Sequence, residues 1–278
     1  MMHLSSTGAL VSALRGARDV DFSSYTLARG RVLGALCAAA RSGAHVRVRL
    51  EGDIYKDGGG AGAVNAAAIA ALRSAGADAS VVHASDDATD AMLHAKVAIV
   101  DGTLFLDDCK WGDEGKDTVV RSDAHEDGAP VTWTKRASLA AEAQLLDAAQ
   151  RGDDVILESE SFGTGNRVCG SLDRIARAGA HVRVLVNARD LRGNPSERRA
   201  LQKLQTLGAE VRITGSSEKF AVLNGTHAWL GSANATAAFS HPDQIDWGAR
   251  TDAPGVVTHL RQAFERRWAG ATVLRAAP

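Results

Sequence analysis

A histidine and a lysine two residues apart are the side chains of this sequence best suited to catalysis. His94 and Lys96 lie in the segment HAKVAIVDG, and Asp101 follows at its end. Because side chains alternate along a strand, His94 and Lys96 point to the same face if this segment is a strand. A nucleophile or base then lies beside a permanent cation. Phosphoryl transfer needs such a pair, since one group attacks phosphorus and the other holds the non-bridging oxygens.

The second half of the chain contains a related segment, SEKFAVLNG, that differs at two of these positions. Ser217 stands at the histidine position, Lys219 at the lysine position and Asn224 at the aspartate position, and Ser232 and Asn234 follow in GSAN. A serine hydroxyl does not titrate near neutral pH, so it cannot replace an imidazole as general acid. We therefore interpret Ser217 and Asn224 as degenerate positions relative to the first segment, with the cation retained at Lys219, and we expect less need for a carboxylate where no imidazole is present.

The two segments occupy equivalent places in an internal duplication. RVLGALCAAARSGAHVRV at 31–48 and RVCGSLDRIARAGAHVRV at 167–184 are identical at twelve of eighteen positions without a gap. Matching segments extend on both sides of this pair. Each copy is predicted to form strand, helix, strand, helix and strand, followed by a β-hairpin that turns at Asp101-Gly102 or Asn224-Gly225.

Alternating strands and helices predict an α/β fold with two similar lobes. We expect each lobe to be a mixed, mostly parallel sheet flanked by helices that cover both of its faces. The polar stretch at 122–137 contains Gly128 and Pro130. We therefore predict a first lobe at 1–121, a linker at 122–137 and a second lobe at 138–278.

The two motifs and the duplication resemble the phospholipase D superfamily, whose signature is HxKxxxxD followed by a GSxN-like segment in each of two halves. The resemblance covers nearly the whole chain. It implies two phospholipase D-type lobes about a pseudo-twofold axis, with both motifs in one cleft. It also implies that one histidine attacks phosphorus to give a phosphohistidine while the other protonates the leaving group, with no metal or cofactor.

Carried over to this sequence, the resemblance makes His94 the nucleophile, Lys96 and Lys219 catalytic phosphate clamps and Asp101 the acidic motif position. Ser232 and Asn234 would bind the substrate phosphate as well. The segment DDCKW at 107–111 resembles the SDRNW variant of the second signature, with lysine where asparagine is expected. Lys110 is therefore a further candidate for phosphate binding, as a point charge on a flexible stem.

Several residues are alternatives for the missing general acid. Glu218 is adjacent in sequence, although on a strand it should point away from Ser217 and Lys219. His227 lies on the far arm of the hairpin, and His241 follows the Asn234 segment. Glu160, after a predicted strand, is a candidate for lining the cleft. The glycine-rich segment DGGGAGAVN at 57–65 lacks the Gly-Lys-Ser/Thr ending of a P-loop, and we predict a loop at the cleft mouth.

Composition excludes several other classes of protein. The net charge of −1 gives no broad basic face for nucleic acid or for stable membrane association. No run of about 18 apolar residues is present, and the start lacks the features of a secretion signal, so we expect a cytoplasmic protein. Three widely spaced cysteines without a CxxC pair argue against disulfides and structural zinc.

Two functions fit these residues. The first is a metal-independent phosphodiesterase or phosphatidyl-type transferase that acts through His94 and is impaired or redirected by Ser217 and Asn224. The second is a catalytically inactive module that binds a phosphodiester. A phospholipid head group, a nucleic acid and a small phosphodiester are all candidate substrates. We expect a monomer rather than a dimer that pairs two His94 motifs, because the chain already contains both lobes.

Overall fold

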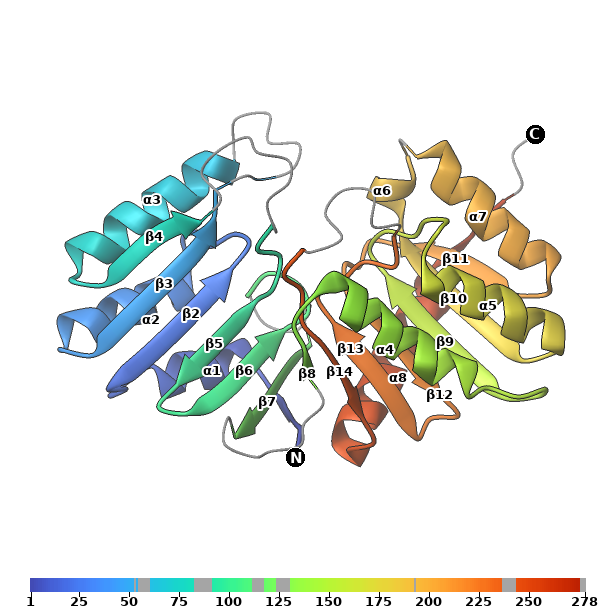
Figure 1. Cartoon of the computed structure of the whole chain (residues 1–278), viewed down its shortest axis with the longest axis horizontal. Helices are drawn as coiled ribbons and strands as arrows, with labels where there is room; N and C mark the ends of the chain where they lie inside the picture. The colour runs from blue at the N-terminus through green and yellow to red at the C-terminus, as the bar shows by residue number, and fades with distance from the viewer. Residues whose placement is uncertain are drawn as a thin grey trace. The chain divides into compact units, whose positions relative to one another are not determined.

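The computed structural model describes the chain except for residues 53, 55–60, 83–91, 112–117, 124–130, 193, 237–243 and 276–278. The chain divides into two compact units, which are described separately (Figure 1). Unit 1 comprises Met1–Ala129 and His241–Trp247, and unit 2 comprises Pro130–Ser240 and Gly248–Pro278. The predicted second lobe was continuous from 138 to 278, whereas the structure assigns a short segment of that range to unit 1.

Unit 1 contains one seven-stranded sheet in the order β1-β7-β6-β5-β2-β3-β4. Its described elements, in chain order, are β1 (His3–Ser5), α1 (Thr7–Ala13), β2 (Asp19–Ser24), α2 (Arg31–Arg41), β3 (His45–Glu51), α3 (Ala61–Ser74), β4 (Asp78–Val82), β5 (Val97–Val100), β6 (Thr103–Asp107) and β7 (Val119–Asp123).

Unit 2 contains one eight-stranded sheet in the order β15-β11-β10-β9-β12-β13-β14-β8. Its described elements are β8 (Val131–Thr132), α4 (Lys135–Asp147), β9 (Asp154–Ser159), α5 (Arg167–Ala178), β10 (His181–Asn187), α6 (Ala188–Leu191), α7 (Pro195–Thr206), β11 (Glu210–Thr214), β12 (Phe220–Leu223), β13 (His227–Gly231), β14 (Gly248–Thr251), α8 (Pro254–Gly270) and β15 (Thr272–Val273).

The two units share the central part of their topology. The order β6-β5-β2-β3-β4 in unit 1 corresponds to β13-β12-β9-β10-β11 in unit 2. Two mixed sheets with flanking helices are confirmed, but the prediction that they are mostly parallel is wrong. Among the described pairings only β2 with β3, β3 with β4, β9 with β10 and β10 with β11 are parallel. The motif strands and those after them are added through hairpins and antiparallel neighbours, and helix-strand alternation does not reveal this.

Local sequence explains where the helices begin and end. The side chains of Thr134 and Asn166 cap α4 and α5 by accepting hydrogen bonds from the backbone N–H groups of Ala137 and Cys169, at 3.2 and 2.9 Å. Helix α5 ends at Gly179, whose φ of 91° is accessible to glycine without steric cost.

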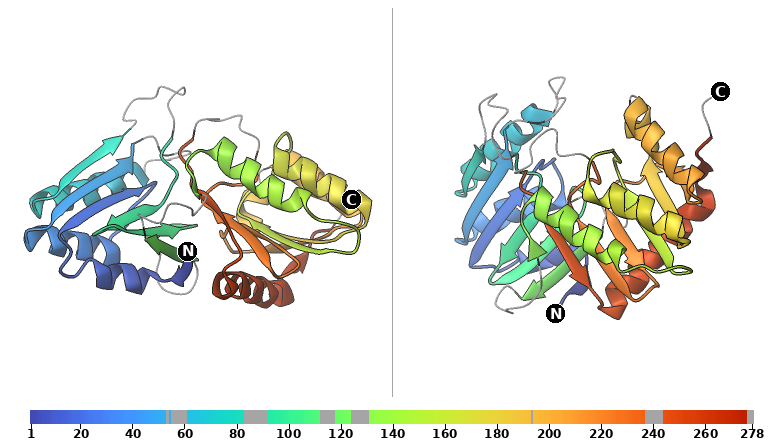
Figure 2. Two further views of the ribbon diagram at one scale, coloured as in Figure 1. Left: turned by 60° about the horizontal axis from the view of Figure 1, so that its bottom comes forward. Right: turned by 45° about the vertical axis from the view of Figure 1, so that its right-hand side comes forward.

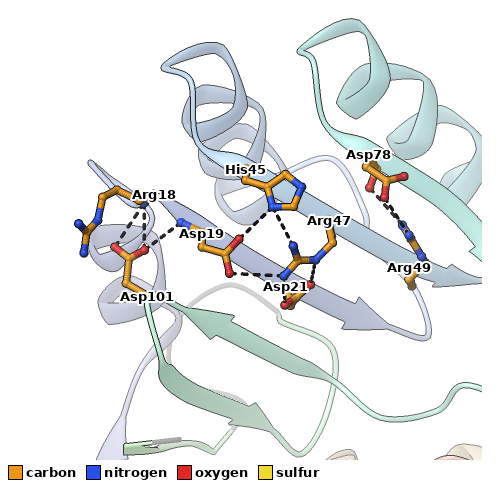
Figure 3. A network of polar contacts seen from close by, with 8 residues as sticks. All are labelled: Arg18, Asp19, Asp21, His45, Arg47, Arg49, Asp78 and Asp101. Atoms are coloured by element: carbon orange, nitrogen blue, oxygen red, sulfur yellow. Dashed lines mark hydrogen bonds and ion pairs between the residues drawn. The ribbon is translucent and has the colours of Figure 1, made fainter.

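The helices cover the two sheets differently. In unit 1 the described helices share one core with alternate residues of β2 and β3, such as Phe22 and Val48. The other face of these strands carries a network of ion pairs and hydrogen bonds (Figure 3), formed by Arg18, Asp19, Asp21, His45, Arg47, Arg49, Asp78 and Asp101. The prediction that helices cover both faces is therefore wrong for these strands.

In unit 2 the corresponding face is covered by α8, on the opposite side of the sheet from α4 and α5 (Figure 2). Arg183 stands where unit 1 has Arg47. Its guanidinium lies 5.4 Å from the ring centroid of Phe264 and 5.6 Å from that of Trp268. Arg183 also pairs with Glu265 at 2.9 Å, so the equivalent arginine keeps an ion pair in unit 2 and in addition packs against the aromatic rings of α8.

Candidate active site

His94 lies directly before β5, in a segment that is held by a strand-like stretch from far along the chain. The carbonyl oxygen of Ile245 accepts hydrogen bonds from the backbone N–H groups of His94 and Ala95, at 2.9 and 2.7 Å, and the Ile245 N–H donates to the carbonyl of Met92 at 2.8 Å. The indole N–H of Trp247 donates to the carbonyl of Asp107 at 2.8 Å. These bonds explain why 241–247 belongs to unit 1.

This arrangement brings Asp246 to the His94 ring. Nδ1 of His94 and Oδ1 of Asp246 are 2.8 Å apart, the Asp246 side chain is fully buried and that of His94 is 14% exposed. A carboxylate accepts hydrogen bonds, so Nδ1 carries the proton and Nε2 presents its lone pair. Sequence analysis missed Asp246, because 152 positions separate it from His94. Its only signal was an acidic residue between Ile245 and Trp247.

Lys96 and Tyr25 complete a group of side chains around His94. Lys96 is only 2% exposed. Its Nζ donates to the carbonyl of His94 and lies 5.8 Å from the ring centroid of Tyr25. The rings of Tyr25 and His94 meet edge to face, with centroids 5.2 Å apart. The predicted pair His94 and Lys96 thus lies together with a buried carboxylate and an aromatic ring.

Two buried residues hold this group in place. A carboxylate oxygen of Glu51, at the end of β3, accepts from the backbone N–H of Leu93. The Asn65 side chain donates to the carbonyls of Glu51 and Tyr25, at 2.9 and 2.8 Å. Asn65 belongs to α3, so the predicted loop at 57–65 is wrong for the part from Ala61 onward, and residues 57–60 lie outside the described residues.

Asp101 lies at the other end of β5 from His94, in the hairpin turn. Its carboxylate accepts hydrogen bonds from the backbone N–H groups of Arg18 and Asp19, at 3.0 and 2.9 Å. These bonds lower the pKa of Asp101 below its usual value. In unit 2 the Asn224 side chain accepts from the N–H of Asp154 at 3.0 Å. Both turn residues have positive φ, 46° at Asp101 and 52° at Asn224.

The aspartate position of the motif therefore has the same backbone contact in both units. The expectation that the carboxylate is less needed because no imidazole is present finds no support in these contacts, because the Asp101 carboxylate accepts its hydrogen bonds from the start of β2. An amide oxygen accepts this N–H bond as well as a carboxylate oxygen does, so Asn224 conserves the turn.

The segment 107–111 is held by Asp107. Its carboxylate accepts from the N–H groups of Cys109 and Trp111, at 2.6 and 2.7 Å. Trp111 is buried against Phe22, with ring centroids 5.6 Å apart. Lys110 stands at the position where the second repeat has Asn234, because Asp107 and Gly231 donate the equivalent backbone bonds to Lys96 and Lys219. Lys110 is exposed, and Cys109 is buried.

In unit 2 the lysine of the motif faces a carboxylate. Nζ of Lys219 lies 3.1 Å from Oε2 of Glu160 and donates to the carbonyl of Ser217 at 2.7 Å. Ser217 Oγ lies 3.5 Å from Nδ2 of Asn187, which also donates to the carbonyl of Ser216 at 2.7 Å. The predicted residues Ser217 and Lys219 thus lie together with Glu160, which sequence analysis considered only as a lining residue.

The GSAN segment lies beside the end of β9. The Ala235 N–H donates to Oγ of Ser159 at 3.1 Å, and Ala235 forms a bridge with Phe162. Ser232 is fully buried, and Oδ1 of Asn234 is buried without a hydrogen-bond partner among the residues that the structure describes. Because Ser159 directly precedes Glu160, the GSAN segment lies close to Glu160 in unit 2.

The alternatives for the missing acid are placed less favourably. Glu218 points away from Lys219, as predicted, and pairs with Arg267 of α8. Arg267 also contacts Glu158 at 2.8 Å. Burial raises the pKa of Glu158 to about 7, against the opposing effect of Arg267. His227 pairs with Leu223 at the end of β12 that is remote from Lys219, and His241 lies outside the described residues.

Among the helices that the structure describes, none has both the length and the apolar character that a bilayer crossing requires.

Comparison with known proteins relates the chain to one superfamily. Residues 143–268 match the family model of the cardiolipin synthase, PLD-like domain. No protein of curated function matches the sequence significantly.

Among solved structures, the chain is similar to the phosphatidylserine synthase of Haemophilus influenzae Rd KW20. The match has a TM-score of 0.68 at 9% identity and covers 98% of this chain and 87% of the other. Polyphosphate kinase of Porphyromonas gingivalis matches with a TM-score of 0.62 at 15% identity over 96% of this chain. This chain spans 50% of the length of that kinase.

A shorter match is to Nuc of Salmonella typhimurium, a phospholipase D family member. It has a TM-score of 0.48 at 15% identity and covers 54% of this chain and 99% of Nuc. The family match in the second half and the fold of both units agree with the motifs in the sequence. The PLD-like domain at 143–268 relates the chain to the phospholipase D superfamily.

Proposed function

We propose that the chain is a metal-independent phosphodiesterase or phosphatidyl-type transferase in which His94 is the nucleophile. The contact of 2.8 Å between His94 and the buried Asp246 carries this proposal. It fixes the tautomer that leaves Nε2 unprotonated, and it places a negative charge where it stabilises the ring once Nε2 has formed a bond to phosphorus. The relation to the superfamily supports the same class of reaction, on phosphodiester substrates.

The proposed reaction has two steps. In the first, Nε2 of His94 attacks phosphorus, the bond from phosphorus to the leaving oxygen breaks, and that oxygen takes a proton from solvent. In the second, water or an alcohol attacks the phosphohistidine, loses a proton to solvent and restores the imidazole. Lys96 holds a non-bridging oxygen in both steps, and its low exposure strengthens the attraction. Lys110 is a second proposed phosphate contact, whereas Asp101 fixes the hairpin that follows the motif strand.

Ser217 determines which substrates react well. With no imidazole at this position, the leaving oxygen has no titrating donor in the motif. Diesters with acidic leaving groups need no such donor, so they should react faster than alkyl diesters. Whether the natural diester is a phospholipid head group, a nucleic acid or a small molecule depends on contacts outside this chemistry.

A second candidate function is favoured by Ser217 itself. A module that binds a phosphodiester without cleaving it needs Lys96, Lys219, Ser232 and Asn234 but no proton carrier.

Turnover of bis-nitrophenyl phosphate in the presence of a chelator distinguishes the two functions. The enzyme predicts turnover by the native protein and none by His94→Ala, and Ser217→His should mainly accelerate diesters with poor leaving groups, by about 10²-fold. Activity that appears only in Ser217→His would identify a lapsed enzyme. Inactivity of all three, together with phosphate binding, would support the binding module.

A further inference from the structure

The repeats differ most sharply at one position next to the motif lysine. Tyr25 in unit 1 and Glu160 in unit 2 are equivalent, because each follows a serine that ends the first parallel strand of its repeat. The Ser24 hydroxyl donates to the carbonyl of Thr26 at 2.9 Å, and the Ser159 hydroxyl donates to the carbonyl of Ser161 at 2.7 Å.

The residue at this position differs in charge between the two repeats. Nζ of Lys96 faces the ring of Tyr25 at 5.8 Å, which contributes no formal charge. Nζ of Lys219 faces a carboxylate oxygen of Glu160 at 3.1 Å, and the side chains are 2% and 22% exposed, respectively. Such a distance is that of an ion pair, and the low exposure of Lys219 means that solvent screens the pair less than it would at the surface.

We propose that Glu160 is an internal competitor for phosphate that occupies the anion-binding side of Lys219. This inference rests on the proposed phosphate chemistry of the fold and assigns a specificity-determining role to Glu160. A phosphate oxygen that approached Nζ of Lys219 to hydrogen-bond distance would lie within a few ångströms of the Glu160 carboxylate. Like charges at that separation repel, so phosphate binds there only if Glu160 moves away.

The contacts around Lys219 agree with an anion-binding position that the Glu160 carboxylate occupies. Glu160 is partly exposed, so it can turn toward solvent, whereas Lys219 is held by its bond to the Ser217 carbonyl. Ser232 and Asn234 lie in the segment bonded to Ser159, one residue before Glu160. Unit 2 thus retains the groups that would bind phosphate, but its cation, Lys219, is paired with the Glu160 carboxylate. A substrate phosphate is therefore excluded from Lys219 while Glu160 is paired with it.

Binding of inorganic phosphate to the full chain, measured by isothermal titration calorimetry, tests this inference. The double variant His94→Ala/Lys96→Met serves as background, so that the signal reports unit 2 and does not depend on turnover. In this background, Glu160→Gln should bind phosphate about tenfold or more tightly. Glu160→Tyr, which installs the residue of unit 1, should give a gain of similar size.

Two further variants identify the cause of that gain. Adding Lys219→Met to Glu160→Gln should remove it. Glu265→Gln is the matched control, because it removes a carboxylate of unit 2 that pairs with Arg183 rather than Lys219. It should change phosphate affinity less than about twofold.

Unchanged affinity in folded Glu160→Gln and Glu160→Tyr would overturn the inference, and so would a gain that survives Lys219→Met or that Glu265→Gln reproduces. The proposed function fails separately, if native protein does not turn over an activated diester.

Discussion

The regions around Lys96 and Lys219 share a scaffold and differ in chemistry. In each repeat the lysine donates to the carbonyl two residues before it, and the hairpin residue accepts an N–H from the start of the first parallel strand. In unit 1 a histidine backed by a buried carboxylate lies beside the lysine. In unit 2 a serine takes its place and a carboxylate faces the lysine itself. The comparison teaches that a repeat can keep its backbone contacts while it exchanges a histidine backed by a carboxylate for a serine, and pairs its lysine with a carboxylate.

The contact between Asp246 and His94 should have the largest effect. Asp246→Asn removes the charge and favours the wrong tautomer, so turnover of bis-nitrophenyl phosphate should fall about 10³- to 10⁴-fold. The control is Asp252→Asn, since Asp252 is an exposed acid in the same part of the sequence. If Asp246→Asn and Asp252→Asn have equally small effects, unit 1 has no activated histidine and the contrast with unit 2 fails.

A buried glutamate should make unit 2 sensitive to pH. Burial alone raises the pKa of Glu142 from 4.5 to about 8, so the folded state keeps it protonated where the unfolded chain ionises it. Its contribution to stability is fully present below pH 4.5 and is lost as the pH rises toward 8. Glu142→Gln should reduce this loss by about 3 kcal/mol.

Urea unfolding of the full chain between pH 5 and pH 8 measures this effect. Glu210→Gln is the control, because Glu210 is an exposed glutamate of the same unit. An equally steep loss in Glu142→Gln would show that Glu142 does not cause it.

Exchanging the two strand-end residues tests the comparison directly. Tyr25→Glu places a carboxylate beside Lys96 and His94, as Glu160 lies beside Lys219. We expect the KM for an activated diester to rise about tenfold through like-charge repulsion, which initial-rate kinetics would show. Tyr25→Phe keeps the ring and should alter KM much less. A similar rise in both variants would assign the effect to lost packing and not to charge.

The hairpin aspartate should have the smallest effect. Asp101→Asn copies Asn224 and keeps an acceptor for the N–H groups of β2, so turnover should change less than about twofold at neutral pH. The lowered pKa of Asp101 stabilises the fold above its unfolded pKa near 3.8, and this contribution is lost as the pH falls through the lower, folded value.

Thermal melting between pH 5 and pH 3 should therefore show a smaller decrease in Tm for Asp101→Asn than for the native chain. A loss of turnover as deep as that of His94→Ala would instead make Asp101 part of the reactive site.

The sequence predicted the candidate site only where its residues are close together in the chain. His94 and Lys96 are two residues apart on an extended segment, so their proximity follows from strand geometry. Asp246 reaches His94 because Ile245 pairs with Leu93, and nothing local encodes that pairing. The Tyr25 and Glu160 difference is visible in the aligned repeats, but its meaning depends on the distance from each side chain to its lysine.

The fold was predictable to a similar degree. Helix and strand alternation gave the two α/β units, whereas strand direction after the hairpins did not follow from periodicity. The aligned repeats also gave no sign that α8 covers a sheet face in unit 2 for which unit 1 has no described helix against β2 and β3. Asp101 was misread because a motif position does not state what its side chain contacts, and here it contacts the backbone of β2.

Trapping the reaction intermediate tests the central claim most directly. Native protein mixed with an activated phosphodiester, quenched in alkali and digested, should yield a peptide with the substrate's phosphoryl ester on His94, as identified by mass spectrometry. The adduct should be absent from His94→Ala, and Lys219→Met should still form it. Turnover that continues in His94→Ala, or an adduct on another residue, would contradict a nucleophilic role for His94.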